Sequence, residues 1–293
     1  MSNKFSDGKP YKVIALCLTR FKDYDQTRVI DEMCRSCRGN NIKIMIFTSV
    51  TDLYDGGLND IGEAQIFSSF EVERFDAIVV MSESFKHSEV LMSLVNNAIR
   101  HDVPVISVDK TIEGCINVVF DYTGAFEQIV RHVVEFHHAR RINMIAGNKG
   151  NPFSEERIRC VRRILSEKNI PFEDERIMYG DFWSDPTRKV MEDFFASGKS
   201  LPDAFICAND IMAIECMRAL KAHGYKVPDD VIVTGFDGID LERYYSPRLT
   251  TAEYDVESLV KNIYDIIENN VDGRKDNDKR TIRYVNRLGG SCG

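Results

Sequence analysis

Residues 202–251 read PDAFICANDIMAIECMRALKAHGYKVPDDVIVTGFDGIDLERYYSPRLTT, and this stretch decides the fold. Two apolar runs in it, Ala204–Cys207 and Val231–Thr234, have the length and composition of buried strands. Between them, Ile211–His223 has the spacing of a helix and ends at Gly224. The order strand, helix, strand predicts two parallel strands joined by a crossover helix. Polar side chains follow both strands, and because ligands bind at the carboxyl ends of such strands, the stretch predicts a small-molecule site.

The same alternation of strands and helices continues along the rest of the chain. Short apolar or alternating runs predict further strands at Lys12–Leu18, Lys43–Phe47, Ala77–Val80, Val105–Val108, Val118–Phe120, Ile142–Ala146, Ile177–Tyr179 and Thr281–Arg287. Amphipathic stretches predict helices at Thr27–Arg38, Ala64–Phe70, Glu89–Arg100, Gly124–Phe136, Glu155–Lys168, Pro186–Ala196 and Val256–Asn269. This repetition predicts an α/β fold in which parallel sheets are flanked by helices, with right-handed crossovers. The two halves of the series are alike in layout, which indicates two similar lobes.

Composition bounds the class of protein. A chain of 293 residues is long enough for two lobes of about 150 residues each. Its net charge of −8 argues against a chain whose main task is to bind phosphates. No apolar run approaches the roughly 20 residues of a membrane span, and the first residues lack the pattern of a signal peptide. We therefore expect a cytoplasmic protein that touches neither membrane nor nucleic acid through this chain.

The eight cysteines favour reduced thiols over disulfides or a metal centre. Cys17 and Cys207 lie in expected buried strands, where a thiol acts as a small hydrophobe. Cys34 and Cys37 form a C-x-x-C, but late in a helix rather than at the N-terminal end where reactive pairs occur. No second pair with metal-ligand spacing accompanies it. No metal and no cofactor are therefore expected.

The sequence carries no signature of the common catalytic sites. A G-x-S-x-G elbow, a P-loop, an H-E-x-x-H motif and a Rossmann glycine motif are all absent. The six histidines fall in expected helices or at their ends, away from the polar residues that follow the strands. Because no acid–base pair can be nominated, we expect a binding protein rather than an enzyme.

Four motifs, in order along the chain, carry a resemblance to a known family. They are Asp121–Ile142 (DYTGA followed by ARRI), Pro202–Ala213 (PDAFICANDIMA), Val227–Asp237 (VPDDVIVTGFD) and Pro247–Thr251 (PRLTT). From about Lys12 to Cys292 the chain resembles the effector-binding domain of the LacI/GalR family, which shares its fold with type 1 periplasmic sugar-binding proteins. The family's helix-turn-helix normally precedes the first strand, and only eleven residues precede it here. The DNA-binding head is therefore expected to be absent.

The resemblance implies two lobes joined by three crossovers, near residues 138–140, 251–256 and 278–281. The implied division of the chain is a tail at 1–11, an N-terminal lobe of 12–138 plus 256–278, and a C-terminal lobe of 139–255 plus 279–293.

Two charged residues are the leading candidates for ligand binding. Asp237 follows a buried strand and Gly235, and its carboxylate can accept two hydrogen bonds from vicinal hydroxyls or an amine; the alternative is a turn-forming Asp. Arg157 matches the ligand-binding Arg of the family, and its guanidinium can donate to two oxygens at once. The competing residue is Arg159, but the spacing of Arg157 to the apolar residues that follow favours it.

Two polar and two aromatic residues complete this wall of the expected site. Asn209 and Asp210 end one strand and begin a helix, where either could cap the helix. We expect Asp210 to cap and Asn209 to contact the ligand, since an amide both donates and accepts. Phe182 and Trp183 are expected to stack on an apolar face of the ligand, with Phe182 foremost; either could instead pack on a neighbouring helix.

The opposite wall is expected to come from the loops that follow the first and third strands. The first supplies Arg20, Phe21 and Asp23, and the second supplies Ser82 or Glu83. Asp121 opens the helix that follows it and could either cap that helix or reach the ligand.

These residues predict a sensor of a small molecule that resembles a sugar or a nucleoside. Binding would close the lobes and control a fused or docked output, such as a GGDEF diguanylate cyclase. Two alternatives are a LacI/GalR-family transcription regulator whose DNA-binding head is absent and the solute-binding protein of a transporter. The resemblance also implies a homodimer.

Overall fold

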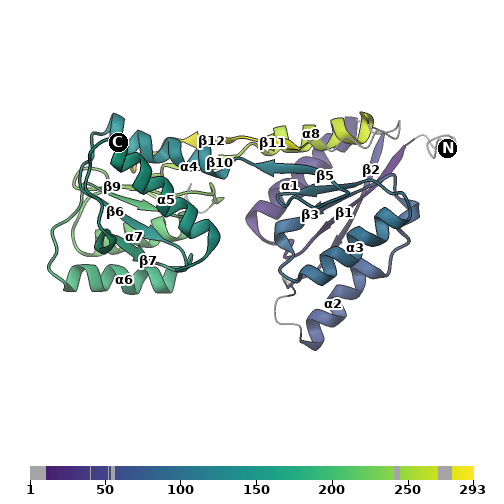
Figure 1. The fold of residues 1–293 in the computed structure, drawn as a ribbon, viewed down its shortest axis with the longest axis horizontal. Helices are drawn as coiled ribbons and strands as arrows, with labels where there is room; N and C mark the ends of the chain where they lie inside the picture. The colour runs from purple at the N-terminus through teal and green to yellow at the C-terminus, as the bar shows by residue number, and fades with distance from the viewer. Residues whose placement is uncertain (1–10, 40, 52, 54–56, 241–244, 270–278) are drawn as a thin grey trace. The chain divides into compact units, whose positions relative to one another are not determined.

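The computed structural model describes residues 11–39, 41–51, 53, 57–240, 245–269 and 279–293. All of the expected tail except its last residue, and most of the charged stretch at 272–280, lie outside the described residues. The chain forms two compact units, of which the first comprises residues 1–120 and 255–282 and the second comprises 121–254 and 283–293 (Figure 1). Among the described residues, no helix combines the length and apolar character needed to cross a bilayer.

The first unit is built on a six-stranded sheet in the order β11-β5-β4-β3-β1-β2, in which every pairing is parallel. Its strands are β1 (Lys12–Leu18), β2 (Ile42–Thr48), β3 (Ala77–Met81), β4 (Val105–Val108), β5 (Ile116–Phe120) and β11 (Arg280–Ile282). Its helices are α1 (Tyr24–Ser36), α2 (Leu58–Ser68), α3 (Ser88–Arg100) and α8 (Val256–Asn269). Helices α1 and α8 pack together on one face, and α2 and α3 on the other (Figure 1).

The apolar runs of the sequence account for this sheet. Strands β3 and β4 are buried along their whole length, and β1 is buried from Ile14 to Leu18. A parallel sheet covered by helices on both faces requires such continuous apolar strands. Edge strand β2 is different, because Met45 and Ile46 are exposed.

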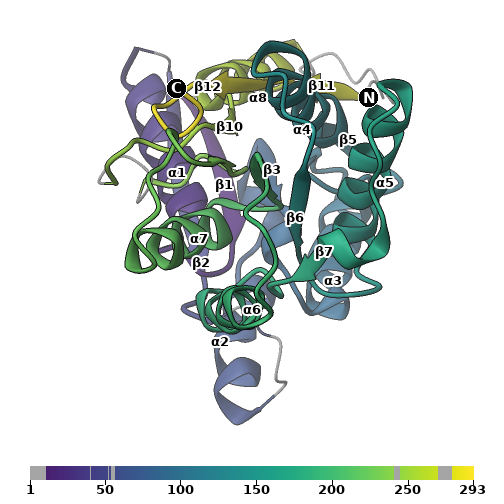
Figure 2. The same ribbon diagram turned by 90° about the vertical axis from the view of Figure 1, so that its left-hand side faces the viewer.

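The second unit has a four-stranded parallel sheet in the order β7-β6-β8-β9 and an antiparallel pair, β10-β12. The strands are β6 (Ile142–Ala146), β7 (Ile177–Tyr179), β8 (Ala204–Cys207), β9 (Ile232–Thr234), β10 (Thr251–Tyr254) and β12 (Tyr284–Arg287). The helices are α4 (Tyr122–Arg131), α5 (Pro152–Glu167), α6 (Ser184–Ala196) and α7 (Asp210–Ala222). Helix α4 pairs with α5 and α6 pairs with α7, on opposite faces of the sheet (Figures 1 and 2).

The structure divides the chain at different points from the expected lobes. The first division lies between Phe120 and Asp121 rather than near residues 138–140, because α4 contacts α5, β10 and β12 of the second unit. The last division falls after Ile282, within the expected strand Thr281–Arg287. That segment forms two strands, since β11 pairs with β5 of the first unit and β12 pairs with β10 of the second. Strand β10, which was not predicted, lies in the stretch expected to be a crossover.

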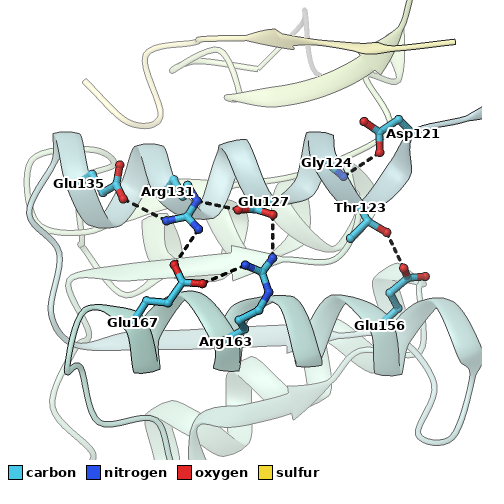
Figure 3. Close-up of polar contacts among 9 residues, drawn as sticks. All are labelled: Asp121, Thr123, Gly124, Glu127, Arg131, Glu135, Glu156, Arg163 and Glu167. Atoms are coloured by element: carbon cyan, nitrogen blue, oxygen red, sulfur yellow. Dashed lines mark hydrogen bonds and ion pairs between the residues drawn. The ribbon is translucent and has the colours of Figure 1, made fainter. Parts of the chain in front are cut away.

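An ion-pair network fastens α4 to α5 (Figure 3). Arg131 donates to Glu127 and to Glu167, each at 2.7 Å. Arg163 donates to the same two carboxylates, at 2.7 and 3.0 Å, and these hydrogen bonds from Arg163 and Arg131 lower the pKa of Glu127. Each pair is partly exposed and contributes at most about 1 kcal/mol. Together they hold the N-terminal helix of the second unit in one register.

The helix expected at Gly124–Phe136 changes its winding near its end. Beyond Arg131 the chain continues as a π-helix, η5 (His132–Phe136), in which the amide of His137 donates to the carbonyl of His132 at 3.3 Å. Single turns of this kind are rare and often occur at functional sites.

Candidate functional site

Two charged side chains, Arg157 and Asp237, lie close together at the carboxyl ends of the strands in the second unit. Arg157, on α5, has an 11% exposed side chain that donates from Nη1 to the Ala208 carbonyl at 2.5 Å. Its guanidinium carbon lies 4.6 Å from the ring centroid of Phe236. Its Nη2 lies 3.8 Å from Oδ1 of Asp237. Arg159, the competing residue, is exposed, so the geometry favours Arg157 as the cation of the site.

The backbone of Asp237 adopts a conformation that few residues other than glycine tolerate. Its φ is 109°, and its amide donates to the Ala252 carbonyl at 2.9 Å. Such strain costs about 1–3 kcal/mol and is concentrated at functional sites. The side chain of Asp237 is 33% exposed, so its carboxylate is accessible while the backbone is held in place.

The capping role expected of Asp210 belongs to Asn209. Asn209 caps α7, because its Oδ1 accepts from the Met212 amide at 2.9 Å. Asp210 is fully buried, and its two carboxylate oxygens accept from the Thr251 hydroxyl at 2.6 Å and the Ile239 amide at 2.9 Å. The capping prediction for Asp210 was wrong because its partners come from a loop and a strand that are distant in the sequence.

Burial raises the pKa of Asp210 well above its usual range, and the nearby Asp237 carboxylate raises it further. The hydrogen bonds from Thr251 and the loop amides act in the opposite direction, but they are smaller. Gly235 permits this arrangement, since a Cβ there would lie 2.2 Å from Oδ1 of Asp210. Asp210 therefore supports the loop that carries Asp237.

The loop after β7 brings an aromatic side chain to the same sheet edge. Phe182 has a φ of 66°, and its ring covers Gly147, where a Cβ would lie 2.0 Å from the ring tip. The carbonyl of Phe182 accepts a hydrogen bond from Nδ2 of Asn209 at 3.1 Å. Trp183 is 63% exposed. The structure thus brings Phe182 and Asn209 together, with Trp183 on the surface beside them.

Asp121 is the N-cap of α4. Its Oδ1 accepts from the Gly124 amide at 2.9 Å, and the residue is exposed (Figure 3). Asp121 was considered either as a helix cap or as a ligand contact, and the hydrogen bond to Gly124 shows that it caps the helix.

The first unit carries a second Arg–Asp pair after β1. Nη2 of Arg20 lies 2.5 Å from Oδ2 of Asp23, and their side chains are 39% and 42% exposed. Asp23 occupies the N-cap position of α1 without capping it through its side chain. Phe21 lies between them in the sequence and is half-buried, with the Lys22 ammonium 5.8 Å from its ring centroid.

Ser82 does not present its hydroxyl at the surface. It is fully buried, and its Oγ lies 2.7 Å from Oγ of Ser107. Glu83, the alternative, is 34% exposed and pairs with Lys86 at 3.1 Å and Lys110 at 3.3 Å. Ser82 was expected to face the ligand because it follows a strand, but the 3₁₀ turn at Ser82–Ser84 directs its hydroxyl into the core.

Two features of the site were not assigned from the sequence. The Ala208 carbonyl anchors Arg157, and the Phe236 ring lies beside the guanidinium. An aromatic residue next to Asp237 in the Gly-Phe-Asp motif was a signal for the second feature. A backbone carbonyl leaves no such signal.

Residues 130–291 match the family model of the periplasmic binding protein-like domain. The probable transcriptional repressor ExuR of Bacillus subtilis is 28% identical over 210 residues, and the repressor PurR of Vibrio vulnificus is 29% identical over 212. These matches cover 71% and 72% of this chain but only 60% and 61% of the two relatives.

Solved structures of regulators share the fold of this chain. The transcriptional regulator CelR in complex with cellobiose is 19% identical with a TM-score of 0.72, covering 96% of this chain and 86% of CelR. A LacI-family regulator from Enterococcus faecium with bound ribose is 15% identical with a TM-score of 0.71, covering 96% of this chain and 98% of the regulator. The family match, the fold and the four motifs agree, so the chain belongs to the periplasmic binding protein-like domain family as a LacI/GalR-type effector-binding domain.

Proposed function

We propose that this chain is the effector-binding part of a transcription regulator and that it binds an uncharged polyhydroxylated molecule, a sugar or a nucleoside. Its curated relatives are named as repressors, which favours this output over a GGDEF diguanylate cyclase. No catalysis and no cofactor are part of the proposal. The net charge of −8 supports a part of the regulator that does not itself contact the phosphates of DNA.

The Arg157–Asp237 geometry carries the proposal. A separation of 3.8 Å exceeds the 2.7–3.2 Å of a direct hydrogen bond, so the two groups are close without being fully engaged with each other. A hydroxyl group can donate to a carboxylate and accept from a guanidinium at the same time. Vicinal hydroxyls therefore match this pair, and the contact of the Arg157 guanidinium with the Phe236 ring helps to hold the side chain in place.

The charges of the site favour a ligand without net charge. Arg157 balances Asp237 in the second unit, and Arg20 balances Asp23 in the first. An anionic ligand would bring its charge toward the two carboxylates, and like charges close together are unfavourable. The ring of Phe182 adds an apolar surface of the kind that suits the flat face of a sugar or a base.

The proposed signal is a change in the arrangement of the two units. A ligand that binds Arg157 and Asp237 more tightly in one arrangement of the chain than in another would favour the first arrangement. Such a ligand shifts the equilibrium only by its difference in affinity for the two states. Hinge closure around a ligand is a common form of this change.

Homodimerisation is part of the proposal. Edge strand β2 exposes Met45 and Ile46, and the neighbouring helix α2 exposes Leu58, Ile61 and Ile66. A cluster of exposed apolar side chains over one edge supports a protein interface there.

The eight free cysteines, most of them buried, support a reducing compartment such as the cytoplasm.

A thermal-shift screen against sugars, nucleosides and polyols tests the proposed site. A true effector should raise the melting temperature of the chain by about 5–10 °C at a hundredfold excess over its dissociation constant, since such an excess stabilises the folded state by about 2.7 kcal/mol. The double variant Arg157→Ala, Asp237→Ala should lose that response, while Arg159→Ala should keep it. A response that survives in the double variant would place the ligand elsewhere.

A further inference from the structure

Three side chains that could hold a metal ion come together in the second unit. His132 and His137 belong to η5 and the residue after it, and Cys292 belongs to the C-terminal segment. One nitrogen of each ring and the Cys292 Sγ all lie within 4.8 Å of one another. The two Nε2 atoms are 3.1 Å apart. No other group of this kind occurs among the residues that the structure describes.

These distances are close to what one tetrahedral ion requires. Zinc binds imidazole nitrogen at about 2.0–2.1 Å and thiolate sulfur at about 2.3 Å, so its ligand atoms lie roughly 3.3–3.6 Å from one another. The two nitrogens already have nearly this separation, and the sulfur needs a shift of about 1.5 Å at most. Two imidazoles and one thiolate form a ligand set that suits zinc.

The π turn is what places both rings together. In an α-helix, residues five apart point about 140° away from each other. The His137 amide instead donates to the His132 carbonyl, which closes a wider turn and puts both side chains on one face. Phe136 stacks on the His132 ring, with a centroid distance of 5.1 Å and an interplanar angle of 13°. The rare backbone form is therefore directly responsible for the cluster.

The protonation chemistry of the cluster is compatible with metal binding. The Nε2 atoms of His132 and His137 lie within hydrogen-bond distance of each other, so at least one of these two nitrogens carries a lone pair rather than a proton. Burial raises the pKa of Cys292 to about 11, while a hydrogen bond with the Thr250 side chain lowers it slightly. A metal ion would displace the thiol proton to solvent as the thiolate forms.

We propose that His132, His137 and Cys292 form a zinc-binding site with a fourth coordination position open to water. The site would tie η5 to the C-terminal segment. Ser291, the residue before Cys292, already fixes that segment by donating to the Val233 carbonyl at 2.6 Å. Zinc binding would therefore stabilise the edge of the second unit at which β9 and the C-terminal segment meet.

Cobalt titration of the metal-free, reduced chain tests the site, because a thiolate ligand gives Co²⁺ a charge-transfer absorption. The titration is made in the Cys34→Ser, Cys37→Ser background, which removes the two thiols that are not buried. We expect the absorption to saturate at one equivalent and to disappear when Zn²⁺ is added. We also expect Cys292→Ser to abolish it and His137→Gln to weaken binding at least about tenfold.

Two controls test whether the cobalt signal is specific to the three proposed ligands and whether the variants are folded. His223→Gln, at an exposed histidine of the same unit, should leave the titration unchanged. If circular dichroism finds Cys292→Ser unfolded, the double variant His132→Gln, His137→Gln replaces it, and Zn²⁺ should then raise the melting temperature of the parent background but not of this variant. No absorption at tenfold excess of cobalt, or a full signal in the folded variants, would overturn the site and leave a simple His–His hydrogen bond.

Discussion

The side-chain amide of Asn209 donates a hydrogen bond to the main-chain carbonyl of Phe182 at 3.1 Å. The two residues follow β8 and β7, which lie on either side of β6, so this bond links two loops across the carboxyl edge of the sheet. The Oδ1 atom of the same side chain caps α7. One residue thus fixes the start of a helix and the position of an aromatic loop.

Replacement of Asn209 should separate these two roles. Asn209→Ala removes both hydrogen bonds and should lower the free energy of unfolding by about 1–2 kcal/mol. Asn209→Asp keeps the capping oxygen but cannot donate to Phe182, so most of the stability should remain while ligand affinity falls. Urea unfolding and calorimetric titration with the effector measure the two effects. Equal stability losses in both variants would contradict this division.

Effector binding should depend on the planar shape of the Arg157 guanidinium as well as on its charge. Arg157→Lys keeps the charge but loses the planar fork that reaches both the Ala208 carbonyl and the neighbourhood of Asp237. We expect effector affinity to fall about 10- to 100-fold in this variant, since hydrogen bonds to charged groups contribute about 1.5–3 kcal/mol. Isothermal titration calorimetry is the measurement. Arg159→Lys is the matched control and should bind normally.

Two glycines should respond differently to the addition of one methyl group. In Gly147→Ala the new Cβ meets the tip of the Phe182 ring, which can move aside. We expect a small change in stability but weaker effector binding. In Gly235→Ala the Cβ meets Asp210 and Leu249, which are buried, so the free energy of unfolding should fall by about 1–3 kcal/mol. Parallel urea unfolding of both variants checks the contrast, and equal losses would refute it.

Asp210 should make stability depend on pH. Its pKa is raised in the folded state, so its contribution is fully present below the unfolded pKa of about 3.9 and is lost as pH rises toward the folded pKa. Asp210→Asn removes this proton linkage and keeps the shape. The stability of the variant relative to the unmodified chain should therefore increase between pH 4 and pH 7. Unfolding at several pH values measures this difference, and a difference that stays constant would show that Asp210 is ionised in both states.

The exposed apolar surface of β2 and α2 should mediate dimerisation. Ile61→Glu places a charge in that surface and should weaken the dimer at least about tenfold, because burial of an unpaired polar group costs about 1–3 kcal/mol. Sedimentation velocity over a range of concentrations measures the change. Val285→Glu, at an exposed apolar residue of β12, should have no effect. Equal sedimentation of both variants and the unmodified chain would exclude this interface.

Much of the secondary structure could be predicted from the sequence. Strands β4, β6, β7 and β8 and helix α8 begin and end at the predicted residues, because each is a continuous apolar run or has a strong helical period. Helices α1 and α2 begin earlier than predicted, at Tyr24 and Leu58. The first turn of α1 is polar, and the apolar residues in the first turn of α2 are exposed, so neither turn adds to a buried apolar face. The segment Thr281–Arg287 could not be divided, because both halves are extended and only their pairing partners differ.

The sequence by itself determined the family, the α/β class and the residue types at the strand ends, because these follow from local periodicity and from motifs. Tertiary structure decided where the candidate residues lie and what they contact. It set Arg157 against the Ala208 carbonyl, buried Asp210 and Ser82, and brought Cys292 to two histidines. Each of these outcomes depends on partners that are distant in the chain. Burial and hydrogen bonding between distant segments are fixed only when the sheets assemble, so no local pattern could specify them.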